Sequence, residues 1–398
     1  MAISGSNGPL YDTFERLPLQ FDYGEGSRLF THNGEEYLDF AAGIAVNSLG
    51  YSHPHLVEAL KSQSKKLWHV SNLYEIPGQF KLGKRLCEIS FADRVFFTNS
   101  GSEAIECAFK TARRWHYANG EPERIDIITF EGAFHGRTLG AIAASGNEKY
   151  TTGFGPKAPG FIQVPFDDFD KLTDAIGKTT AAILIEPVQG EAGIRPIPNN
   201  CLRNLRELCN KESIFLIYDE VQCGVGRTGK LFTYEWADSA APDIMAIAKG
   251  IGGGFPLGAC LATEKAASAM QPGTHGTTYG GNPLAMAVGN AVLDIILEEG
   301  FLENIQRTTL LLTQKLAKIT NNYPDLIQEF RGSGLMQGLK CKISNIKIVR
   351  AFCDQNLLTA PAGNNVVRLL PPLMISENDI CDAYKKMDAA LSKIRKSD

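Results

Sequence analysis

No apolar run in this 398-residue sequence approaches the roughly 18 residues that a helix needs to cross a bilayer. The segment Met1–Gln20 has neither the basic start nor the apolar centre of a signal peptide, and it lacks the arginine bias of a transit peptide. These absences predict a cytoplasmic protein that has no membrane partner.

Paired cysteines and an excess of positive charge are missing as well. The nine cysteines include no C-x-x-C pair, which favours reduced thiols over a disulfide framework or a zinc site. The formal net charge is −4, so we expect no nucleic-acid surface. His53 and His55 have no accompanying cluster of ligands, and no metal is expected.

Short apolar runs recur through the middle of the chain. They lie at Val95–Phe97, Ile125–Phe130, Ala181–Ile185, Ile214–Tyr218 and Ile244–Ile247. Because they lack polar alternation, they are typical of strands buried on both faces of a mostly parallel sheet. Amphipathic segments separate them, which predicts a large α/β domain over residues 56–282.

The two ends of the chain predict a smaller α+β domain, built from residues 1–55 and 283–398. Asn282-Pro283 supplies an N-cap and a proline for a helix that we expect to stop near Gly300. Two further helices are expected at Leu302–Ile319 and Asn378–Ile394.

Gly224–Gly229 matches G-x-G-x-x-G, and with Lys230 it nearly matches a nucleotide-binding P-loop. A P-loop needs a hydroxyl residue after the lysine to hold magnesium, but Leu231 stands there. Both motifs also need a helix that opens at the glycines, and the aromatic segment Lys230–Asp238 has no helical periodicity. A glycine-rich turn after a buried strand is the favoured interpretation.

Lys249 lies between an apolar strand and the glycines 250 and 252–254. Glycines allow close backbone approach to a ligand, and a desolvated lysine has a lowered pKa that suits Schiff-base chemistry. Asp219 ends another apolar run, where a parallel strand faces the usual ligand crevice. Taken alone, a strand-end aspartate is more often a solvated group.

Two further segments follow predicted strands. Ser100-Gly101-Ser102 opens a predicted helix, where free N–H groups bind anions, although a plain serine cap is common and this segment alone is weak evidence for a phosphate site. In Phe134–Arg137 the aromatic ring could stack on a flat ligand and the arginine could pair with a carboxylate. Pyridoxal 5'-phosphate (PLP) needs these features together: an amine, a carboxylate for its ring nitrogen, an anion cradle and a flat partner.

Several longer strings stand in one order along the chain. They are Thr98–Ala104, Phe134–Thr138, Glu186–Glu191, Asp219–Gln222, Ala248–Gly250 and Thr274–Pro283. With these strings the chain resembles the class III (ω-) aminotransferases of PLP fold type I, from about Tyr11 to Leu391. The resemblance implies a large domain with a mostly parallel mixed sheet between helices, and a homodimer with shared active sites.

The resemblance also implies roles toward PLP. Lys249 would carry the cofactor as a Schiff base and shuttle a proton, and Asp219 would pair with the pyridinium nitrogen. The other expected contacts are Gln222 with the phenolic oxygen and Phe134 with the ring face. Gly101 and Ser102 would bind the phosphate, joined by Thr278 from the neighbouring subunit.

Within the class, Ala42–Val46 and Phe130–Thr138 are similar to the subgroup that uses N2-acetyl-L-ornithine as amino donor and 2-oxoglutarate as acceptor, in arginine biosynthesis. Enzymes for free ornithine typically carry a tyrosine near the position of Gly43, and none is present. Alternatives are an enzyme for succinylornithine, ornithine, 4-aminobutyrate, succinyldiaminopimelate or another diamine, or an aminomutase that needs no 2-oxoglutarate.

The resemblance assigns four residues to the substrates. Arg137 would bind the α-carboxylate of acetylornithine and the γ-carboxylate of glutamate, and Arg368 the α-carboxylate of glutamate. Thr277 would contact acetylornithine. Glu191 would pair with Arg368 while the first substrate is bound, which is a hypothesis about charge masking.

Overall fold

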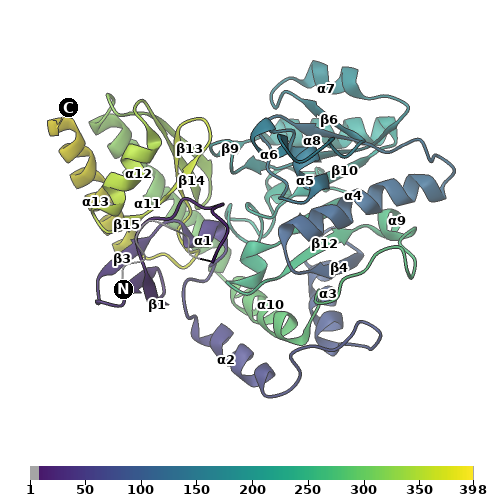
Figure 1. Cartoon of the computed structure of the whole chain (residues 1–398), viewed down its shortest axis with the longest axis horizontal. Coiled ribbons are helices and arrows are strands. Elements are labelled where there is room, and N and C mark those ends of the chain that lie inside the picture. Colours follow the sequence, from purple (N-terminus) through teal and green to yellow (C-terminus); the bar gives the residue numbers. More distant parts are fainter. Residues whose placement is uncertain (1–8, 398) are drawn as a thin grey trace.

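A seven-stranded sheet forms the centre of the larger body in the computed structural model, which describes residues 9–397 (Figure 1). The strand order is β4-β12-β11-β10-β7-β5-β6. The bounds are β4 Arg94–Thr98, β5 Asp126–Phe130, β6 Phe161–Val164, β7 Thr180–Ile185, β10 Phe215–Asp219, β11 Ile244–Ile247 and β12 Gly258–Ala262. Only β12 is antiparallel to its neighbours, so the expected mostly parallel sheet is confirmed.

Both faces of this sheet are covered, which explains the missing polar alternation in its strands. Leu184 and Ile217 point to the cluster beneath α4, whereas Ile183 and Leu216 point to the main core on the opposite face. Helices of this body are α2 Pro54–Ser64, α3 Pro77–Glu88, α4 Gly101–Ala118, α5 Leu139–Ser145, α6 Glu148–Thr151, α7 Phe169–Ala175, α8 Asn199–Glu212, α9 Glu264–Ala267 and α10 Pro283–Ile296. Its short elements are β8 Val188–Gln189, β9 Arg195–Pro196, η1 Thr233–Trp236 and η2 Lys249–Gly252.

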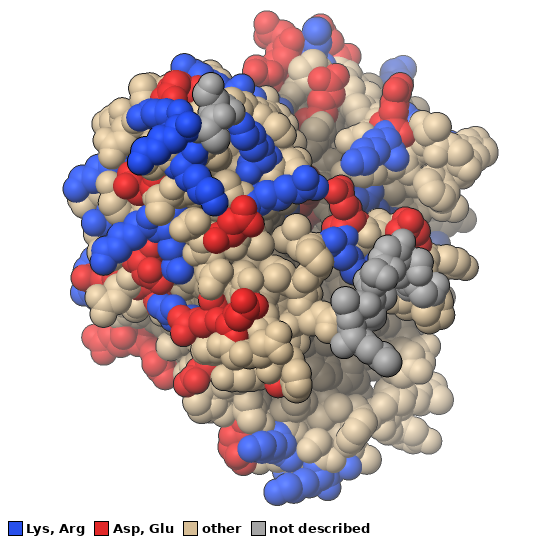
Figure 2. All heavy atoms as spheres, turned by 60° about the vertical axis from the view of Figure 1, so that its left-hand side comes forward, with Lys and Arg blue, Asp and Glu red and all other residues tan. Residues whose placement is uncertain are grey.

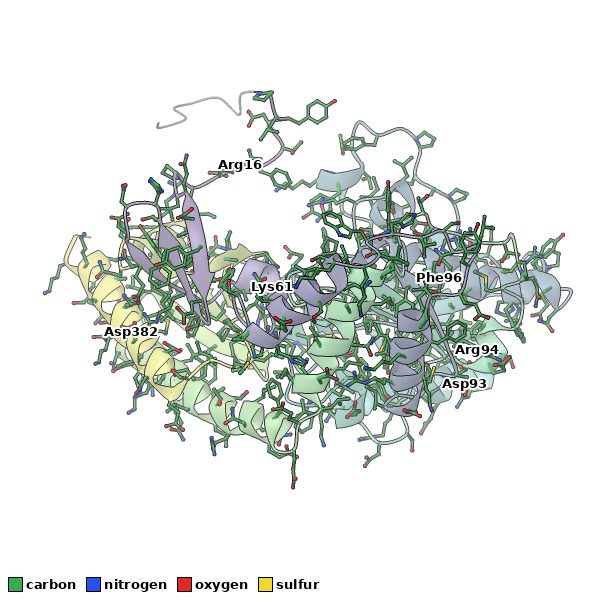
Figure 3. All side chains as sticks on the ribbon, turned by 90° about the horizontal axis from the view of Figure 1, so that it is seen from below. Arg16, Lys61, Asp93, Arg94, Phe96 and Asp382 are labelled. Atoms are coloured by element: carbon green, nitrogen blue, oxygen red, sulfur yellow. The ribbon has the colours of Figure 1, made fainter. Side chains whose placement is uncertain are left out.

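The second body joins the two ends of the chain. Strand β3 pairs in parallel with β15, so the N-terminal strands lie beside the C-terminal helices (Figures 1 and 3). One sheet has the order β1-β2-β3-β15 and the other β13-β14-β17-β16. The strands are β1 Phe21–Glu25, β2 Arg28–Thr31, β3 Glu36–Asp39, β13 Ile327–Ser333, β14 Met336–Cys341, β15 Leu357–Leu358, β16 Ala360–Ala362 and β17 Val366–Leu369, and the helices are α11 Phe301–Asn322, α12 Asn345–Cys353 and α13 Glu377–Ser397.

Figure 3 shows the two bodies side by side, with Asp382 of α13 on one flank and Arg94 and Phe96 of β4 on the other. On the face of the second body, Lys and Arg side chains lie among Asp and Glu (Figure 2). Within the described residues, no helix is long and apolar enough to span a membrane.

The predicted helix after Asn282 begins as expected, because the Asn282 side chain accepts a hydrogen bond from the N–H of Ala285. It ends at Ile296 rather than near Gly300, which instead precedes α11 with φ 80°. Helix α10 packs against α2, α3 and η2 of the larger body. The domain boundaries at 55/56 and 282/283 stay predictions, and residues 1–8 of the first segment lie outside the described chain.

The turn α1, Ala42–Ala45, has an unusual left-handed backbone. Its φ angles are 46°, 63°, 62° and 63°, although only Gly43 lacks a Cβ atom. Such a backbone costs an L-residue about 1–2 kcal/mol. The buried Asp39 carboxylate offsets part of this cost by accepting the N–H groups of Ala41 and Ala42 at 2.7 and 3.0 Å. The turn delivers Val46 to the cavity described below.

Candidate active site

A cavity of 330 Å³ opens where the carboxyl ends of five sheet strands meet. Since these strands run in the same direction, the segments that follow them share one edge of the sheet. The residues that line the cavity include Asn99–Ser102 after β4, Phe134–Gly136 after β5, Glu186 after β7, Asp219, Val221 and Gln222 at the end of β10, and Ala248 and Lys249 after β11.

Lys249 begins η2 with φ 49°, a left-handed conformation that an L-residue keeps only when its surroundings enforce it. Burial, followed by the charge of Arg368, lowers the pKa of its amine to about 8. Within residues 9–397, no hydrogen bond or ion pair involves its Nζ atom. The site therefore holds an unpaired amine with an enhanced neutral fraction near neutral pH.

The buried carboxylate of Asp219 is held by two donors. Oδ2 lies 2.8 Å from Nδ1 of His135, and Oδ1 accepts the N–H of Val221 at 3.0 Å. A carboxylate oxygen carries two lone pairs, so Asp219 retains capacity for another donor in the cavity. His135, which sequence reasoning named only as part of a string, fixes the orientation of this carboxylate.

The N-terminus of α4 forms an anion cradle. The Ser100 side chain caps the helix by accepting the N–H of Glu103 at 3.3 Å. Gly101 and Ser102 supply the first helical N–H groups, which have no intrahelical acceptor. The 134–137 loop approaches so closely that a Cβ on Gly136, where φ is 129°, would lie 2.2 Å from Oγ of Ser102.

Glu186 is a second buried carboxyl group that sequence reasoning gave no role. Its Oε2 accepts the N–H of Phe134 at 3.0 Å, which fixes the start of the loop that carries Phe134 and His135. Burial and the neighbouring charge of Asp219 raise the pKa of Glu186 well above its usual range. The only sequence feature that pointed to Glu186 was its place at the start of the Glu186–Glu191 string.

Arg368 on β17 reaches the cavity region from the second body. Its side chain is 3% exposed, and Nη1 lies 2.5 Å from Oε1 of Glu191 and 3.1 Å from Oε1 of Gln222. The Nε atom has no partner among the described residues. An arginine in this state can exchange Glu191 for the carboxylate of a ligand.

The other expected substrate residues are arranged differently. Arg137 is exposed, and its guanidinium lies over the rings of Tyr150 and Phe134, at 3.6 and 5.0 Å from their centroids. Thr277 lines a separate hollow, and its Oγ1 accepts the N–H of Gly280 at 3.1 Å. Thr278 is exposed and does not line the cavity beside Lys249.

The structure thus brings together most of the predicted residues within one chain. The cavity is lined by Gly101, Ser102, Phe134, Asp219, Gln222 and Lys249, and Arg368 and Glu191 adjoin it through Gln222. The model of the family Aminotransferase class-III matches residues 12–391. The chain belongs to the class III aminotransferases.

Relatives agree with this assignment. The chain is 64% identical to the acetylornithine aminotransferase of Mesorhizobium japonicum, over 96% of each chain. N-acetylornithine aminotransferase from Stenotrophomonas maltophilia is 35% identical with a TM-score of 0.84, over 96% of this chain and 97% of that one. Ornithine aminotransferase from Toxoplasma gondii, described with PLP partially occupying its active site, is 30% identical with a TM-score of 0.93, over 98% and 93%.

The residues of this class III aminotransferase fit PLP. Lys249 offers an unpaired amine, and Asp219 is a buried carboxylate with spare acceptor capacity. The free N–H groups of Gly101 and Ser102 offer donors to a phosphate. All of them border one cavity of 330 Å³.

Proposed function

We propose that the chain transfers the terminal amine of N2-acetyl-L-ornithine to 2-oxoglutarate, giving N-acetyl-L-glutamate 5-semialdehyde and L-glutamate, in arginine biosynthesis. The observation that carries the proposal is the Arg368–Glu191 ion pair beside the unpaired amine of Lys249. A reversible carboxylate site next to a reactive amine suits an enzyme with two unlike substrates. The 64% identity to an acetylornithine aminotransferase supports the choice of donor.

The cofactor is PLP in this proposal. Its expected protein contacts are Lys249, Asp219, Gln222, Phe134, Gly101 and Ser102, with Thr278 contributed by a second subunit. When bound, PLP supplies an electron sink for the negative charge that develops on a substrate carbon as it loses its proton. Asp219, oriented by His135, stabilises a protonated ring nitrogen by its charge.

Lys249 moves the proton in both half-reactions. A lysine with a pKa of about 8 has an appreciable neutral fraction near pH 7.5, whereas an ordinary lysine has almost none. The neutral Nζ takes a proton from the carbon that bears the donor amine. The protonated Nζ later returns a proton to the carbon that becomes Cα of glutamate.

The arginines select the substrates. Arg137 binds the α-carboxylate of acetylornithine and the γ-carboxylate of glutamate, and Thr277 contacts acetylornithine. Glu191 neutralises Arg368 while the donor is bound, because the donor's reacting end carries no carboxylate. The α-carboxylate of 2-oxoglutarate or glutamate then replaces Glu191 at Arg368.

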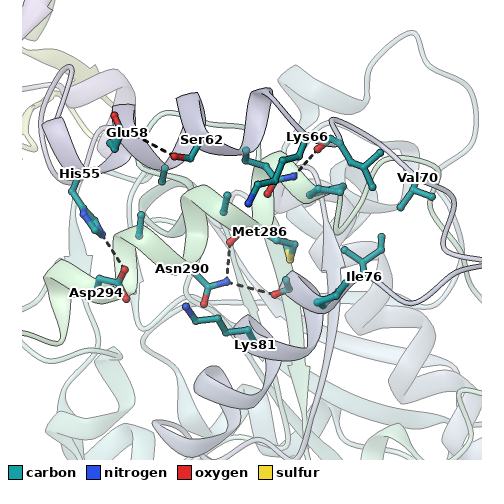
Figure 4. A pocket seen from close by; sticks show the side chains of 18 of the residues that line it. His55, Glu58, Ser62, Lys66, Val70, Ile76, Lys81, Met286, Asn290 and Asp294 are labelled. Carbon is teal, nitrogen blue, oxygen red and sulfur yellow. Dashed lines mark hydrogen bonds and ion pairs between the residues drawn. The ribbon is translucent and has the colours of Figure 1, made fainter.

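We also propose a homodimer. Large apolar side chains are exposed close together in sequence, with Trp68 66%, Leu73 87% and Tyr74 67% exposed. Their sequence neighbours Leu67 and Glu75 line a hollow of 540 Å³ between α2, α3 and α10, where Ile76 and Met286 lie among polar side chains (Figure 4). A partner covering this surface would bury it, and Thr277 and Thr278 lie outside their own chain's cavity, as a shared site requires.

An ornithine aminotransferase is the second candidate, because the Toxoplasma gondii enzyme has nearly the same fold. Its identity is 30%, less than half of that to the Mesorhizobium enzyme. The absence of a tyrosine at Ala42–Ala45 also disfavours it.

A panel of amino donors tests the proposal. Each of acetylornithine, succinylornithine, ornithine, 4-aminobutyrate and succinyldiaminopimelate is paired with 2-oxoglutarate, and glutamate formation is measured. We expect kcat/KM for acetylornithine to exceed that for ornithine by about a hundredfold, because a pocket that accepts the acetyl amide leaves a free α-ammonium poorly partnered. Equal rates would reject the proposed donor, and turnover without 2-oxoglutarate would point to an aminomutase.

A further inference from the structure

The Gly224–Gly229 segment, whose sequence imitates a nucleotide loop, is a buried tight turn at the joint between the two bodies. Its N–H groups are used internally: Gly226 donates to Leu231 O at 2.9 Å and Gly229 to Gly226 O at 2.9 Å. No helix opens at these glycines, since the next regular element is η1 at Thr233. The segment therefore lacks the free glycine N–H groups and the helix start that a phosphate-binding loop needs.

This turn contacts the second body through its backbone. The N–H of Leu335 donates to Arg227 O at 2.9 Å. A Cβ on Gly334, where φ is 57°, would lie 2.4 Å from the same oxygen. The two backbone segments are therefore in direct contact. Gln306 of α11 donates to Gly229 O at 2.7 Å.

The Arg227 side chain extends this joint. It is 2% exposed, and Nη1 donates to Leu335 O at 3.2 Å and to Pro371 O at 2.5 Å. Its guanidinium has no carboxylate partner within residues 9–397, and its Nη2 atom has no hydrogen-bond partner there. Burying an unpaired cation is costly, so stability alone does not explain an arginine at this place.

The two carbonyls that Arg227 binds flank β17, which carries Arg368, and its neighbour β14. Leu335 immediately precedes β14, and Pro371 lies just beyond the end of β17. Strands β14 and β17 pair with Gly338 opposite Arg368. On the cavity side, Gln222 lies two residues before this segment, and its Oε1 accepts a hydrogen bond from Nη1 of Arg368 at 3.1 Å.

We propose that Arg227 is a positioning residue for the dicarboxylate substrate, acting through Arg368. By holding Leu335 and Pro371 it fixes the β14–β17 pair against the Gln222–Gly229 segment, and so sets the place of the Arg368 guanidinium at the cavity. The inference rests on the proposed function, in which Arg368 binds the α-carboxylate of 2-oxoglutarate.

Binding of glutarate, a five-carbon dicarboxylate without a reactive carbonyl, tests this role in the PLP-loaded enzyme by titration calorimetry. Arg227→Met fills the space without a donor, and we expect it to weaken glutarate binding by about tenfold through the lost hydrogen bonds. The first half-reaction with acetylornithine should change less than threefold. Arg227→Lys keeps one donor and should weaken binding less, and it carries the test should the methionine variant not fold.

Two controls separate positioning from general loosening. Arg113 also donates to backbone carbonyls, those of Ile125 and Gly160 at 2.8 and 2.9 Å, but at the far end of α4. Arg113→Met should therefore leave glutarate binding unchanged. If Arg227 acts through Arg368, the double variant Arg227→Met/Arg368→Met should bind glutarate no more weakly than Arg368→Met alone.

Unchanged glutarate affinity in the Arg227 variants would overturn the inference, as would equal losses in both half-reactions or full additivity with Arg368→Met. Glutarate binding does not depend on which amine the enzyme accepts. An enzyme that fails the donor panel can therefore still pass this test, so the two failures are distinguishable.

Discussion

Arg368 and Glu191 form an ion pair of 2.5 Å between Nη1 and Oε1, in which the arginine side chain is 3% exposed and the glutamate side chain 31% exposed. The pair joins a strand of the second body to the 186–191 segment of the larger body. Because the arginine is already neutralised, a carboxylate ligand must displace Glu191 rather than simply add to the site.

Glu191→Gln should therefore change the ratio of the KM values of the two half-reactions. Without the competing charge, we expect the KM of the glutamate half-reaction to fall several-fold, and that of the acetylornithine half-reaction to rise, so that their ratio shifts by about tenfold. Stopped-flow absorbance of each half-reaction measures this. The control is Glu264→Gln, which removes the exposed partner of Arg94; an unchanged ratio in Glu191→Gln would refute the masking role.

His135 offers a second test, since its Nδ1 is 2.8 Å from the Asp219 carboxylate. His135→Leu leaves Oδ2 of Asp219 without this donor, and we expect kcat to fall about tenfold as the carboxylate loses its orientation. His135→Asn retains a donor and should recover part of the rate. If both variants were equally slow, while keeping normal PLP content and thermal stability, orientation of Asp219 would not be the cause.

The lowered pKa of Lys249 predicts how stability depends on pH in the cofactor-free chain. The folded amine has a pKa of about 8, below its unfolded value of roughly 10.4. Between these two pH values the unfolded state binds more protons than the folded state, so this group makes the free energy of unfolding rise with pH. Below a pH of about 8 the folded chain carries the full penalty for burying the charged amine.

Urea unfolding from pH 7 to 10 measures this effect, with Lys249→Met as the reference that lacks the amine. Wild type should gain stability relative to the variant as the pH rises from 8 to 10. A constant difference across that range would show that Lys249 is not desolvated in the folded chain.

The proposed dimer can be tested on its exposed aromatic surface. Trp68 is 66% exposed, and burying an indole at an interface contributes strongly to association. Trp68→Glu should shift the protein from dimer to monomer in analytical ultracentrifugation at micromolar concentration. Leu310 on α11 is 64% exposed outside this surface, so Leu310→Asp should remain a dimer. A monomeric wild type, or an unaffected Trp68→Glu dimer, would exclude this interface.

Lys249 and Asp219 could be predicted from the sequence because uninterrupted apolar runs mark parallel strands, and the carboxyl ends of such strands share one edge. The contact between His135 and Asp219 could not, since 84 residues separate them and their proximity depends on the order of β5, β7 and β10. Strand β12, Gly258–Ala262, escaped prediction because small residues give it little strand signal.

The left-handed turn at Ala42–Ala45 could not be predicted from the sequence either. Three of its residues have Cβ atoms, and the conformational preference of such residues disfavours this backbone. It depends on Asp39, whose bonds to the turn appear only in three dimensions. Thr277 and Thr278 mark a different limit: they lie outside the cavity of their own chain, so one chain cannot test their predicted roles.

Lys249→Ala tests whether Lys249 is the residue that carries PLP and moves the proton. The variant should keep its fold and still bind PLP. Borohydride should fix the cofactor covalently on Lys249 of the wild type, and mass spectrometry should detect no such label on the variant. Turnover of acetylornithine with 2-oxoglutarate should fall by at least about a thousandfold, as expected when the nucleophile and proton carrier are removed. Substantial residual transamination in a variant that retains PLP would show that Lys249 does not have this role.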